Sequence, residues 1–355
     1  MPLSRGERLA DEPVRVAVVG AGVFGRNHLR VYRELERVGQ PVELAAVVDP
    51  SADAREWAAS EYGIAAFASI EECMRHSRAN LRRIHAASVC VPTVEHSKIA
   101  RQLMDCGIDL LIEKPIASSL AEADEIVRSA EELGRVVQVG HLERFNPAVR
   151  AVRELLHEPM FFEVHRLSVF TPRSLDVDVV LDLMIHDLDI VLTLVGTPVR
   201  EVRAVGLPVL SNKVDIANVR LEFENGCVAN FTASRVSTER VRKMRFFQPH
   251  QYLSLDFARQ DLLLIDVTAA AGLDPAQLAA MGGTGGHPSG GMSLRKVPVQ
   301  AGEPLRLELE AFLEAVRQRT VPEATVEEGR AALALALEIN AAIAAHAQRT
   351  GLISR

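Results

Sequence analysis

The residues of this chain best suited to acid–base chemistry are one lysine after an apolar run and one Asp–His pair. Lys114 follows the run DLLIE and precedes Pro115. If that run is a parallel strand, Lys114 lies beyond its carboxyl end, where doubly wound sheets bind ligands. A lysine there can hydrogen-bond a substrate oxygen and stabilise developing negative charge. Since lysines after strands are more commonly solvated surface residues, a catalytic role needs further support.

That support comes from the apolar segment Val179–Val195, VVLDLMIHDLDIVLTLV. It predicts a buried helix. Since successive residues of a helix are about 100° apart around its axis, the polar positions 182, 186, 189 and 193 fall in one stripe along it. Asp182 and His186 are four residues apart, so the carboxylate can orient the imidazole and raise its basicity. His186 is then a candidate base. The alternatives are a purely structural pair and a zinc site; the latter lacks a third ligand, so no metal is predicted.

A glycine-rich turn predicts a dinucleotide site. The run VRVAVVG leads into Gly20-Ala21-Gly22-Val23-Phe24-Gly25, and a helical pattern follows. The first glycine of such a turn allows a tight bend, the second lets a pyrophosphate approach, and the third lets helix and strand pack closely. The helix N-terminus adds free N–H groups and a positive dipole end. We therefore assign cofactor binding to Gly20, Gly22, Val23, Phe24 and Gly25.

Asp49 ends the next apolar run of the chain. An acid at this place accepts hydrogen bonds from ribose hydroxyls and repels a 2′-phosphate, which favours NAD over NADP. The alternative is that Asp49-Pro50 only begins a turn.

Apolar runs alternate with helical patterns through the first 140 residues. The predicted strands are 14–20, 42–49, 88–91, 109–112 and 136–139, and the predicted helices are about 52–62, 95–107 and 120–134. This alternation predicts an α/β Rossmann domain over residues 1–140, built on a doubly wound parallel sheet. We expect residues 1–12 to be disordered.

Residues 141–355 have a different rhythm, which predicts a second domain of the α+β class. Helices are expected near 147–157 and 179–195, and strands at 162–169, 199–209, 215–223, 227–234, 244–247 and 252–256. Their close spacing, with a hairpin turn at Glu224-Asn225-Gly226, predicts an open, largely antiparallel sheet. Gly282–Gly291 predicts a surface loop without an assigned role. Two helices, 303–319 and 326–348, close the chain, and we expect the terminal one to pack back on the first domain.

The overall composition argues against several kinds of partner. The 355 residues carry a net charge of −7, so no basic excess favours nucleic acid. The sequence has no run of about 18 apolar residues that would predict a membrane span. The first residues lack the apolar core of a secretory signal. The four cysteines have no metal-ligand spacing, which is typical of reduced thiols in a cytoplasmic protein.

Taken together, these motifs resemble the glucose–fructose oxidoreductase/inositol dehydrogenase/rhizopine-catabolism oxidoreductase family. The matching segments stand in family order; they are VAVVGAGVFGRNHLRVY, VVDPS, VPTVEHSKIA, DLLIEKPIASSLAEADEIV, VGHLERFNPAV and DLMIHDLDIVL. The resemblance implies NAD-dependent oxidation of a sugar hydroxyl, with Lys114 near the nicotinamide. It implies that Asp182 and His186 are the catalytic Asp-x-x-x-His. From the residues alone, Lys114 and His186 could exchange roles as the base.

The same resemblance implies further contacts and an assembly state. The residues expected to border the cofactor are Pro92, Thr93, His96, Glu113 and Lys114. Homodimers or homotetramers are expected, because the open sheet of the second domain often mediates them in this family.

A finer resemblance concerns the substrate. GHLERFNPAV, DLMIHDLDIVL and the segment 215–248 are similar to the branch that oxidises C3 of UDP-N-acetylglucosamine, whose keto product an aminotransferase converts for lipid A synthesis. A diphosphate needs cationic partners, and arginine forks suit it. The substrate candidates are Arg144, Asn146, Arg166 and Arg235, with ordinary surface arginines as the alternative. Two other functions stay open: an inositol or free-sugar dehydrogenase, and a non-catalytic regulator that binds NAD and sugar.

Overall fold

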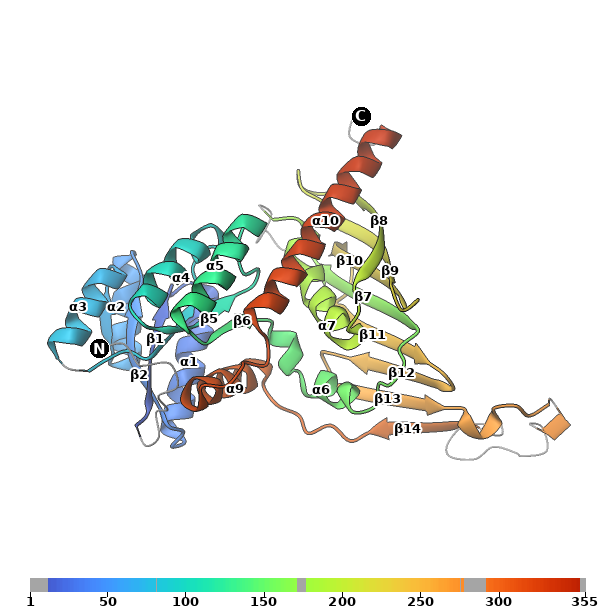
Figure 1. Cartoon of the computed structure of the whole chain (residues 1–355), viewed down its shortest axis with the longest axis horizontal. Coiled ribbons are helices and arrows are strands. Elements are labelled where there is room, and N and C mark those ends of the chain that lie inside the picture. The colour runs from blue at the N-terminus through green and yellow to red at the C-terminus, as the bar shows by residue number, and fades with distance from the viewer. Residues whose placement is uncertain (1–11, 81, 171–176, 275, 278–291, 352–355) are drawn as a thin grey trace. The chain divides into compact units, whose positions relative to one another are not determined.

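The structure is a computed structural model (Figure 1). It describes residues 12–80, 82–170, 177–274, 276–277 and 292–351. Residues 1–11 and the loop Gly282–Gly291 therefore lie outside the described residues. The chain divides into two compact units, which are described separately below. Unit 1 comprises Met1–Leu142 and Glu303–Leu333, and unit 2 comprises Glu143–Gly302 and Ala334–Arg355.

Unit 1 is built on a six-stranded parallel sheet with the order β3-β2-β1-β4-β5-β6. Its strands are β1 (Val14–Val19), β2 (Val42–Val48), β3 (Ala65–Phe67), β4 (Ala86–Val89), β5 (Asp109–Glu113) and β6 (Val137–Gly140). The strands are apolar on both faces because helices cover both sides of the sheet. The predicted Rossmann sheet is confirmed. Its strand order reverses between β1 and β4, the position at which such sheets bind ligands.

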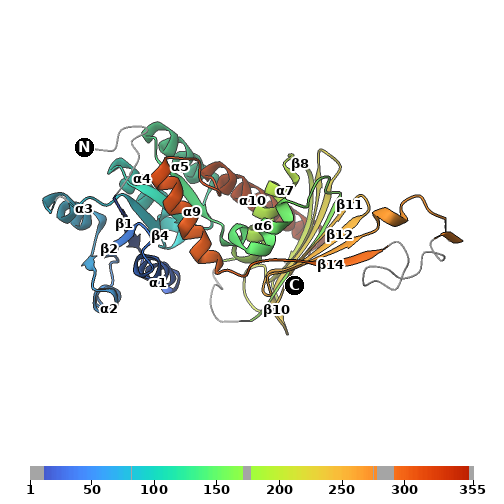
Figure 2. The same ribbon diagram turned by 90° about the horizontal axis from the view of Figure 1, so that it is seen from below.

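The helices of unit 1 lie on both faces of this sheet. They are α1 (Val23–Arg37), α2 (Ala52–Tyr62), α3 (Ile70–Ala79), the 3-10 turn η1 (Thr93–Glu95), α4 (His96–Asp105), α5 (Leu120–Leu133) and α9 (Pro304–Gln318). Helices α1 and α9 lie on one side and α4 and α5 on the other (Figure 2). Tyr32 of α1 and Leu309 and Phe312 of α9 share one buried core cluster. This packing explains why α9 belongs to unit 1, although its sequence position placed it in our second domain.

Local signals set the helix ends of unit 1. Ser51, Ser69 and Ser119 each accept a hydrogen bond from the N–H three residues later and cap α2, α3 and α5. Gly63 and Gly134 end α2 and α5 in the left-handed conformation that favours glycine. The helices therefore begin and end where capping chemistry predicts.

Unit 2 contains a mixed eight-stranded sheet with the order β14-β13-β12-β11-β7-β10-β9-β8. Its strands are β7 (Phe161–Val169), β8 (Val199–Leu207), β9 (Ile216–Phe223), β10 (Val228–Ser237), β11 (Val241–Gln248), β12 (Gln251–Asp256), β13 (Asp261–Asp266) and β14 (Ser293–Val297). Only the β7–β10 pair among these described strands is parallel. The predicted largely antiparallel sheet is thus confirmed, including the β9–β10 hairpin, in which Gly226 has a φ of +83°.

One face of this sheet is buried and the other is open to solvent. Along β9, buried Val219 and Leu221 alternate with exposed Asn218 and Arg220. The helical elements of unit 2 are η2 (Leu142–Phe145), α6 (Pro147–Arg153), the π-helical η3 (Val180–Met184), α7 (Ile185–Val195), the 3-10 turn η4 (Thr268–Ala270) and the later part of α10 (Val326–Thr350). The alternation of buried and exposed residues along β9 is the pattern expected for a sheet that is covered on one side only.

Helix α10 is long and apolar enough, by length and composition, to meet a criterion for membrane spans. Core helices of soluble proteins meet the same criterion. Leu335, Ile339 and Ile343 are buried, and a Cβ at Gly206 of β8 would lie 3.1 Å from the Ile343 side chain. Packing within unit 2 therefore accounts for the apolar face of α10.

Several predicted elements were wrong in extent or missing. The strand predicted at 88–91 is β4, Ala86–Val89, and the helix predicted at 147–157 ends at Arg153. The strands β3, β13 and β14 were not predicted. β3 has only three residues and β14 exposes four of its five, so neither has the apolar alternation from which a strand is predicted.

Candidate active site

The glycine-rich turn after β1 has the geometry of a phosphate-binding loop. Gly20 has a φ of +93°, and a Cβ there would lie 2.6 Å from the carbonyl oxygen of Cys90. A Cβ at Gly25 would lie 1.8 Å from the carbonyl oxygen of Gly20. Helix α1 can therefore approach the turn only because residue 25 is glycine. At Gly22, nothing lies within 4 Å of such a Cβ, so space remains where a pyrophosphate would approach.

Helix α1 begins at this turn with its first N–H groups available to an anion. Gly22 occupies the N-cap position and has no side chain that could accept their hydrogen bonds. Val23 and Phe24 form the first turn, and their side chains are 67% and 37% exposed. These N–H groups and the positive end of the helix dipole fit the diphosphate of a dinucleotide.

A cavity of about 720 Å³ opens beside this turn, within unit 1. Gly20, Gly22 and Asp49 line it, together with Pro92 and Lys98. Asp49 accepts hydrogen bonds from the N–H groups of Ala21 at 2.7 Å and Ser51 at 2.8 Å. The carboxylate thus fixes the glycine turn and also lies on the cavity wall, where the sequence predicted a ribose contact. Lys98 was missed, because nothing in its local sequence separates it from a surface lysine.

The loop after β4 contains two of the predicted cofactor neighbours and a buried histidine. Pro92 lines the cavity, and Thr93 begins η1. His96 is buried, with Nδ1 3.0 Å from the carbonyl oxygen of Pro115 and Nε2 3.0 Å from that of Val91. Burial lowers the pKa of His96 and favours the neutral ring, which donates to one carbonyl at a time. His96 therefore joins two loops of unit 1.

Lys114 directly follows the last residue of β5. It is half-buried, and the Lys114–Pro115 peptide bond is cis, a point that the sequence left open. Its neighbour Glu113 is buried, with Oε1 3.0 Å from Nε2 of His28 on α1. Glu113 is in contact with His28, and its predicted place at the cofactor border stays a prediction. His28, three residues after Gly25, was not predicted as a site residue, because no local sequence signal separates it from the other positions of α1.

Asp182 and His186 lie at the start of the helix predicted to be catalytic. Both are half-buried, although Met184 and Ile185 between them are buried. The segment is not one uniform α-helix as predicted. It opens as the π-helical η3, which contains Asp182, and continues as α7, in which His186 is the second residue. The α-helical spacing that we used to pair them therefore does not apply to this turn.

No metal site is evident in the part of the chain that the structure describes. Among those residues, no group of three or more His, Cys, Asp and Glu side chains is arranged to hold an ion.

Two of the predicted substrate arginines form buried ion pairs. Arg144 donates to both carboxylate oxygens of Asp189 at 2.6 Å. Arg166 donates to Asp187 at 2.7 and 2.8 Å and to Glu143 at 2.9 Å. Burial alone would lower the pKa of Arg166, but the two carboxylates outweigh it and raise that pKa. Both guanidinium groups are buried and paired with carboxylates.

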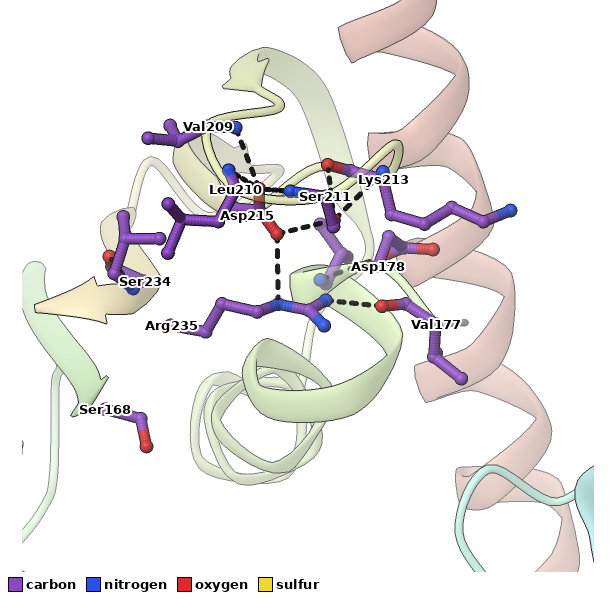
Figure 3. A network of polar contacts seen from close by, with 12 residues as sticks. Ser168, Val177, Asp178, Val209, Leu210, Ser211, Lys213, Asp215, Ser234 and Arg235 are labelled. Atoms are coloured by element: carbon purple, nitrogen blue, oxygen red, sulfur yellow. Dashed lines mark hydrogen bonds and ion pairs between the residues drawn. The ribbon is translucent and has the colours of Figure 1, made fainter. Parts of the chain in front are cut away.

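The other two substrate candidates hold the backbone of unit 2. Arg235 donates to the carbonyl oxygen of Val177 and lies 3.6 Å from Asp215 (Figure 3). Asn146 caps α6 through the N–H of Ala148 and donates to the carbonyl oxygen of Phe257 at 3.0 Å. All four substrate candidates thus have structural partners within unit 2, and their role in substrate binding stays a prediction.

Figure 3 also shows Arg235 beside the segment that leads into the candidate catalytic helix. The Val177 carbonyl that it holds directly precedes Asp178, whose Oδ1 accepts from the N–H groups of Val180 and Leu181. Asn340 of α10 donates to the other carboxylate oxygen of Asp178 at 3.0 Å. Arg235 and Asp178 thus fix the entry of η3, the turn that contains Asp182.

Comparison with known proteins places these features in a family. Residues 14–141 match the oxidoreductase family with an NAD-binding Rossmann fold, and residues 123–248 match the GFO/IDH/MocA C-terminal domain. The chain is 35% identical over 337 residues to UDP-N-acetylglucosamine 3-dehydrogenase of Acidithiobacillus ferrooxidans, covering 95% of this chain and 99% of that protein. A crystal structure of that dehydrogenase matches with a TM-score of 0.81 and 33% identity, over 94% of this chain and 98% of the other.

Two further relatives are more distant. Inositol 2-dehydrogenase of Leifsonia xyli subsp. xyli is 29% identical over 196 residues, 53% of this chain and 56% of that protein. An oxidoreductase from Agrobacterium radiobacter, solved in complex with NAD⁺, L-tartaric acid and magnesium, shares the fold at a TM-score of 0.76 and 16% identity, over 93% and 96% of the two chains. Both domain matches and the full-length likeness agree with the glycine turn and the Rossmann sheet. The chain is an NAD-dependent oxidoreductase and belongs to the GFO/IDH/MocA family.

Proposed function

We propose that this chain oxidises the C3 hydroxyl of a UDP-N-acetylhexosamine, with UDP-N-acetylglucosamine as the leading substrate. The observation that carries this proposal is the likeness to UDP-N-acetylglucosamine 3-dehydrogenase, which extends over 99% of that protein's length. We assign the reaction to Lys114, which belongs to unit 1, and to Asp182 and His186, which belong to unit 2.

Unit 1 supplies the cofactor site in this proposal. The N–H groups at the start of α1 and the open backbone at Gly22 bind the diphosphate, and Asp49 accepts hydrogen bonds from the adenosine ribose. When bound, the oxidised nicotinamide ring supplies the hydride acceptor.

The protein's own groups move the proton. His186 accepts the proton of the reacting hydroxyl. The role of Asp182 in orienting the His186 imidazole rests on the family's Asp-x-x-x-His pattern, because the π-helical turn removes the support of α-helical spacing. Lys114 donates a hydrogen bond to the oxygen of the reacting hydroxyl and stabilises the negative charge that develops on it. The exchanged assignment, with Lys114 as the base, uses the same residues, because burial can lower the pKa of a lysine enough for that role.

The product of this reaction is a 3-keto nucleotide sugar. A ketone at C3 is a substrate for transamination, so we propose that an aminotransferase consumes it in the synthesis of an amino sugar for lipid A. A cytoplasmic location and a homodimer or homotetramer formed through the open sheet of unit 2 stay predictions.

The decisive test is NADH absorbance with purified protein, NAD⁺ and UDP-N-acetylglucosamine, with a glutamate-dependent aminotransferase added to remove the keto product. Rising absorbance that requires the nucleotide sugar is the expected result. A flat trace with UDP-N-acetylglucosamine, while inositol or a free hexose is oxidised, would discard the substrate and keep the family.

Inositol oxidation is the second candidate, because the Leifsonia inositol 2-dehydrogenase also resembles this chain. A flat trace with every sugar, together with tight NAD⁺ binding, would favour a non-catalytic regulator that binds NAD and sugar.

A further inference from the structure

Both neighbours of Lys114 in the chain are held by buried histidines of unit 1. Glu113 contacts Nε2 of His28 at 3.0 Å, and the carbonyl oxygen of Pro115 contacts Nδ1 of His96 at 3.0 Å. His96 is the first residue of α4, whereas His28 lies on α1, the helix that begins at the phosphate-binding turn. Lys114 is thus the residue between two anchored positions.

The contact between His28 and Glu113 is enclosed by protein. The His28 side chain is fully buried, and the Glu113 side chain is 11% exposed. An ionised carboxylate only accepts hydrogen bonds, so with Glu113 ionised Nε2 of His28 is the donor. Phe24 and Tyr32, one turn away on either side along α1, place their rings 5.5 and 6.4 Å from the imidazole. These rings limit the orientations that His28 can adopt.

The position of the Glu113 carboxylate is also set by the adjacent strand. Glu113 pairs with Gly140 at the end of β6. A Cβ at Gly140 would lie 2.9 Å from Oε1 of Glu113, the atom that contacts His28. The carboxylate therefore occupies space that exists only because residue 140 is glycine.

Packing alone does not account for a histidine at position 28. Its Nδ1 is buried and has no hydrogen-bond partner among the described residues. An unsatisfied buried polar atom costs free energy, and an apolar side chain of similar size would avoid that cost. The contact with Glu113 is the benefit that offsets this cost. Glu113 is the residue directly before Lys114.

We propose that His28 is a positioning residue for Lys114: through Glu113 it ties the strand end that presents the lysine to the helix that binds the cofactor diphosphate. This inference rests on the proposed catalytic role of Lys114. Loss of His28 then leaves the diphosphate site intact and misplaces Lys114. A displacement of about 1 Å at a catalytic group can cost on the order of 10²-fold in rate.

The experiment compares His28→Leu, which removes the donor, with His28→Gln, whose amide can donate from nearly the same place as Nε2. Tyr32→Phe is the matched control, because it removes another buried hydrogen bond of α1, the 2.8 Å contact with Ser88. We expect His28→Leu to lower kcat by about 10-fold or more, with the Kd for NAD⁺ and the KM for UDP-N-acetylglucosamine within about twofold of wild type. His28→Gln should restore most of kcat, and Tyr32→Phe should retain it.

A second readout does not depend on the substrate. The rate at which an amine-selective acylating reagent labels Lys114, measured by mass spectrometry relative to exposed Lys296, should change in His28→Leu and stay constant in Tyr32→Phe. If the wild-type protein oxidises no sugar, the proposed function fails while this labelling still tests His28.

If His28→Leu does not fold, His28→Asn serves in its place, because its shorter side chain cannot reach Glu113. An unchanged kcat or labelling rate in a folded donor-free variant, or an equal loss in Tyr32→Phe, would overturn the proposal.

Discussion

Arg166 of β7 and Asp187 of α7 form a two-point ion pair, with Nε to Oδ2 at 2.7 Å and Nη2 to Oδ1 at 2.8 Å. Both side chains are buried, and the same guanidinium also binds Glu143. Asp187 directly follows His186 in the chain. The pair therefore fixes the first turn of α7 against the sheet and with it the backbone from which the candidate base extends.

Removing one partner of this pair should strongly destabilise the protein. Asp187→Asn leaves the Arg166 charge buried without its main partner, and such a change costs about 3–5 kcal/mol. The double variant Arg166→Met, Asp187→Asn should lose less than the sum of Arg166→Met and Asp187→Asn, because the interaction between the two charges is lost only once; Glu143 loses its Arg166 partner in both variants that carry Arg166→Met. Urea unfolding of the four proteins in a double-mutant cycle measures the coupling. A cost near zero for Asp187→Asn would contradict the assignment.

The two candidate catalytic residues should affect turnover and leave cofactor binding largely intact. His186→Asn and Lys114→Met should each lower kcat by about 10²–10⁴-fold, the usual contribution of a positioned acid–base group. NAD⁺ affinity, measured by calorimetry, should stay close to wild type. His165→Asn on β7 is a suitable control, because that histidine belongs to the opposite face of the sheet from Arg166. Near-normal kcat in both catalytic variants would reject the mechanism.

The sequence predicted unit 1 well because its signals are local. Apolar runs, serine caps and the spacing of Gly20, Gly22 and Gly25 each act within a few residues, and the parallel sheet follows from their order. The roles of Arg144 and Arg166 could not be predicted in this way. Their carboxylate partners lie 45 and 21 residues away, and no local pattern shows that a cation will be neutralised by tertiary packing. Asp187 was missed because it lies off the polar stripe of its helix.

Asp215 should make part of the stability of unit 2 dependent on pH. Burial of this carboxylate opposes its charge, but hydrogen bonds from Ser211 and from the N–H groups of Val209 and Leu210 outweigh that effect and lower its pKa to about 2. A lowered folded-state pKa means that the stabilisation is fully present above the unfolded-state pKa, about 3.9. It is lost as the pH falls from about 4 towards 2, and its size is about 2 kcal/mol.

The measurement for Asp215 is the free energy of unfolding of wild type and Asp215→Asn at several pH values. The gap between the two proteins should be constant above about pH 5 and should narrow steadily below about pH 4. Asp261→Asn, at an exposed ion pair with Lys296, is the control and should show a small gap at every pH. A difference in unfolding free energy between wild type and Asp215→Asn that widens in acid would show that the pKa of Asp215 is raised and not lowered.

Alanine substitutions at Gly22 and Gly25 should distinguish an effect on NAD⁺ affinity alone from an effect on both affinity and stability. At Gly22 the φ is −67° and an added Cβ meets no protein atom within 4 Å, so Gly22→Ala should unfold at nearly the wild-type denaturant concentration. The new methyl group occupies the space through which a diphosphate approaches, so NAD⁺ affinity should fall by about 10-fold or more, or at least 1.4 kcal/mol. At Gly25 an added Cβ lies 1.8 Å from the carbonyl oxygen of Gly20. Gly25→Ala must therefore push α1 away from the turn and lose stability as well as affinity. Full NAD⁺ affinity in Gly22→Ala would show that this turn is not the diphosphate site, and equal unfolding midpoints for both variants would show that α1 does not need a glycine at position 25.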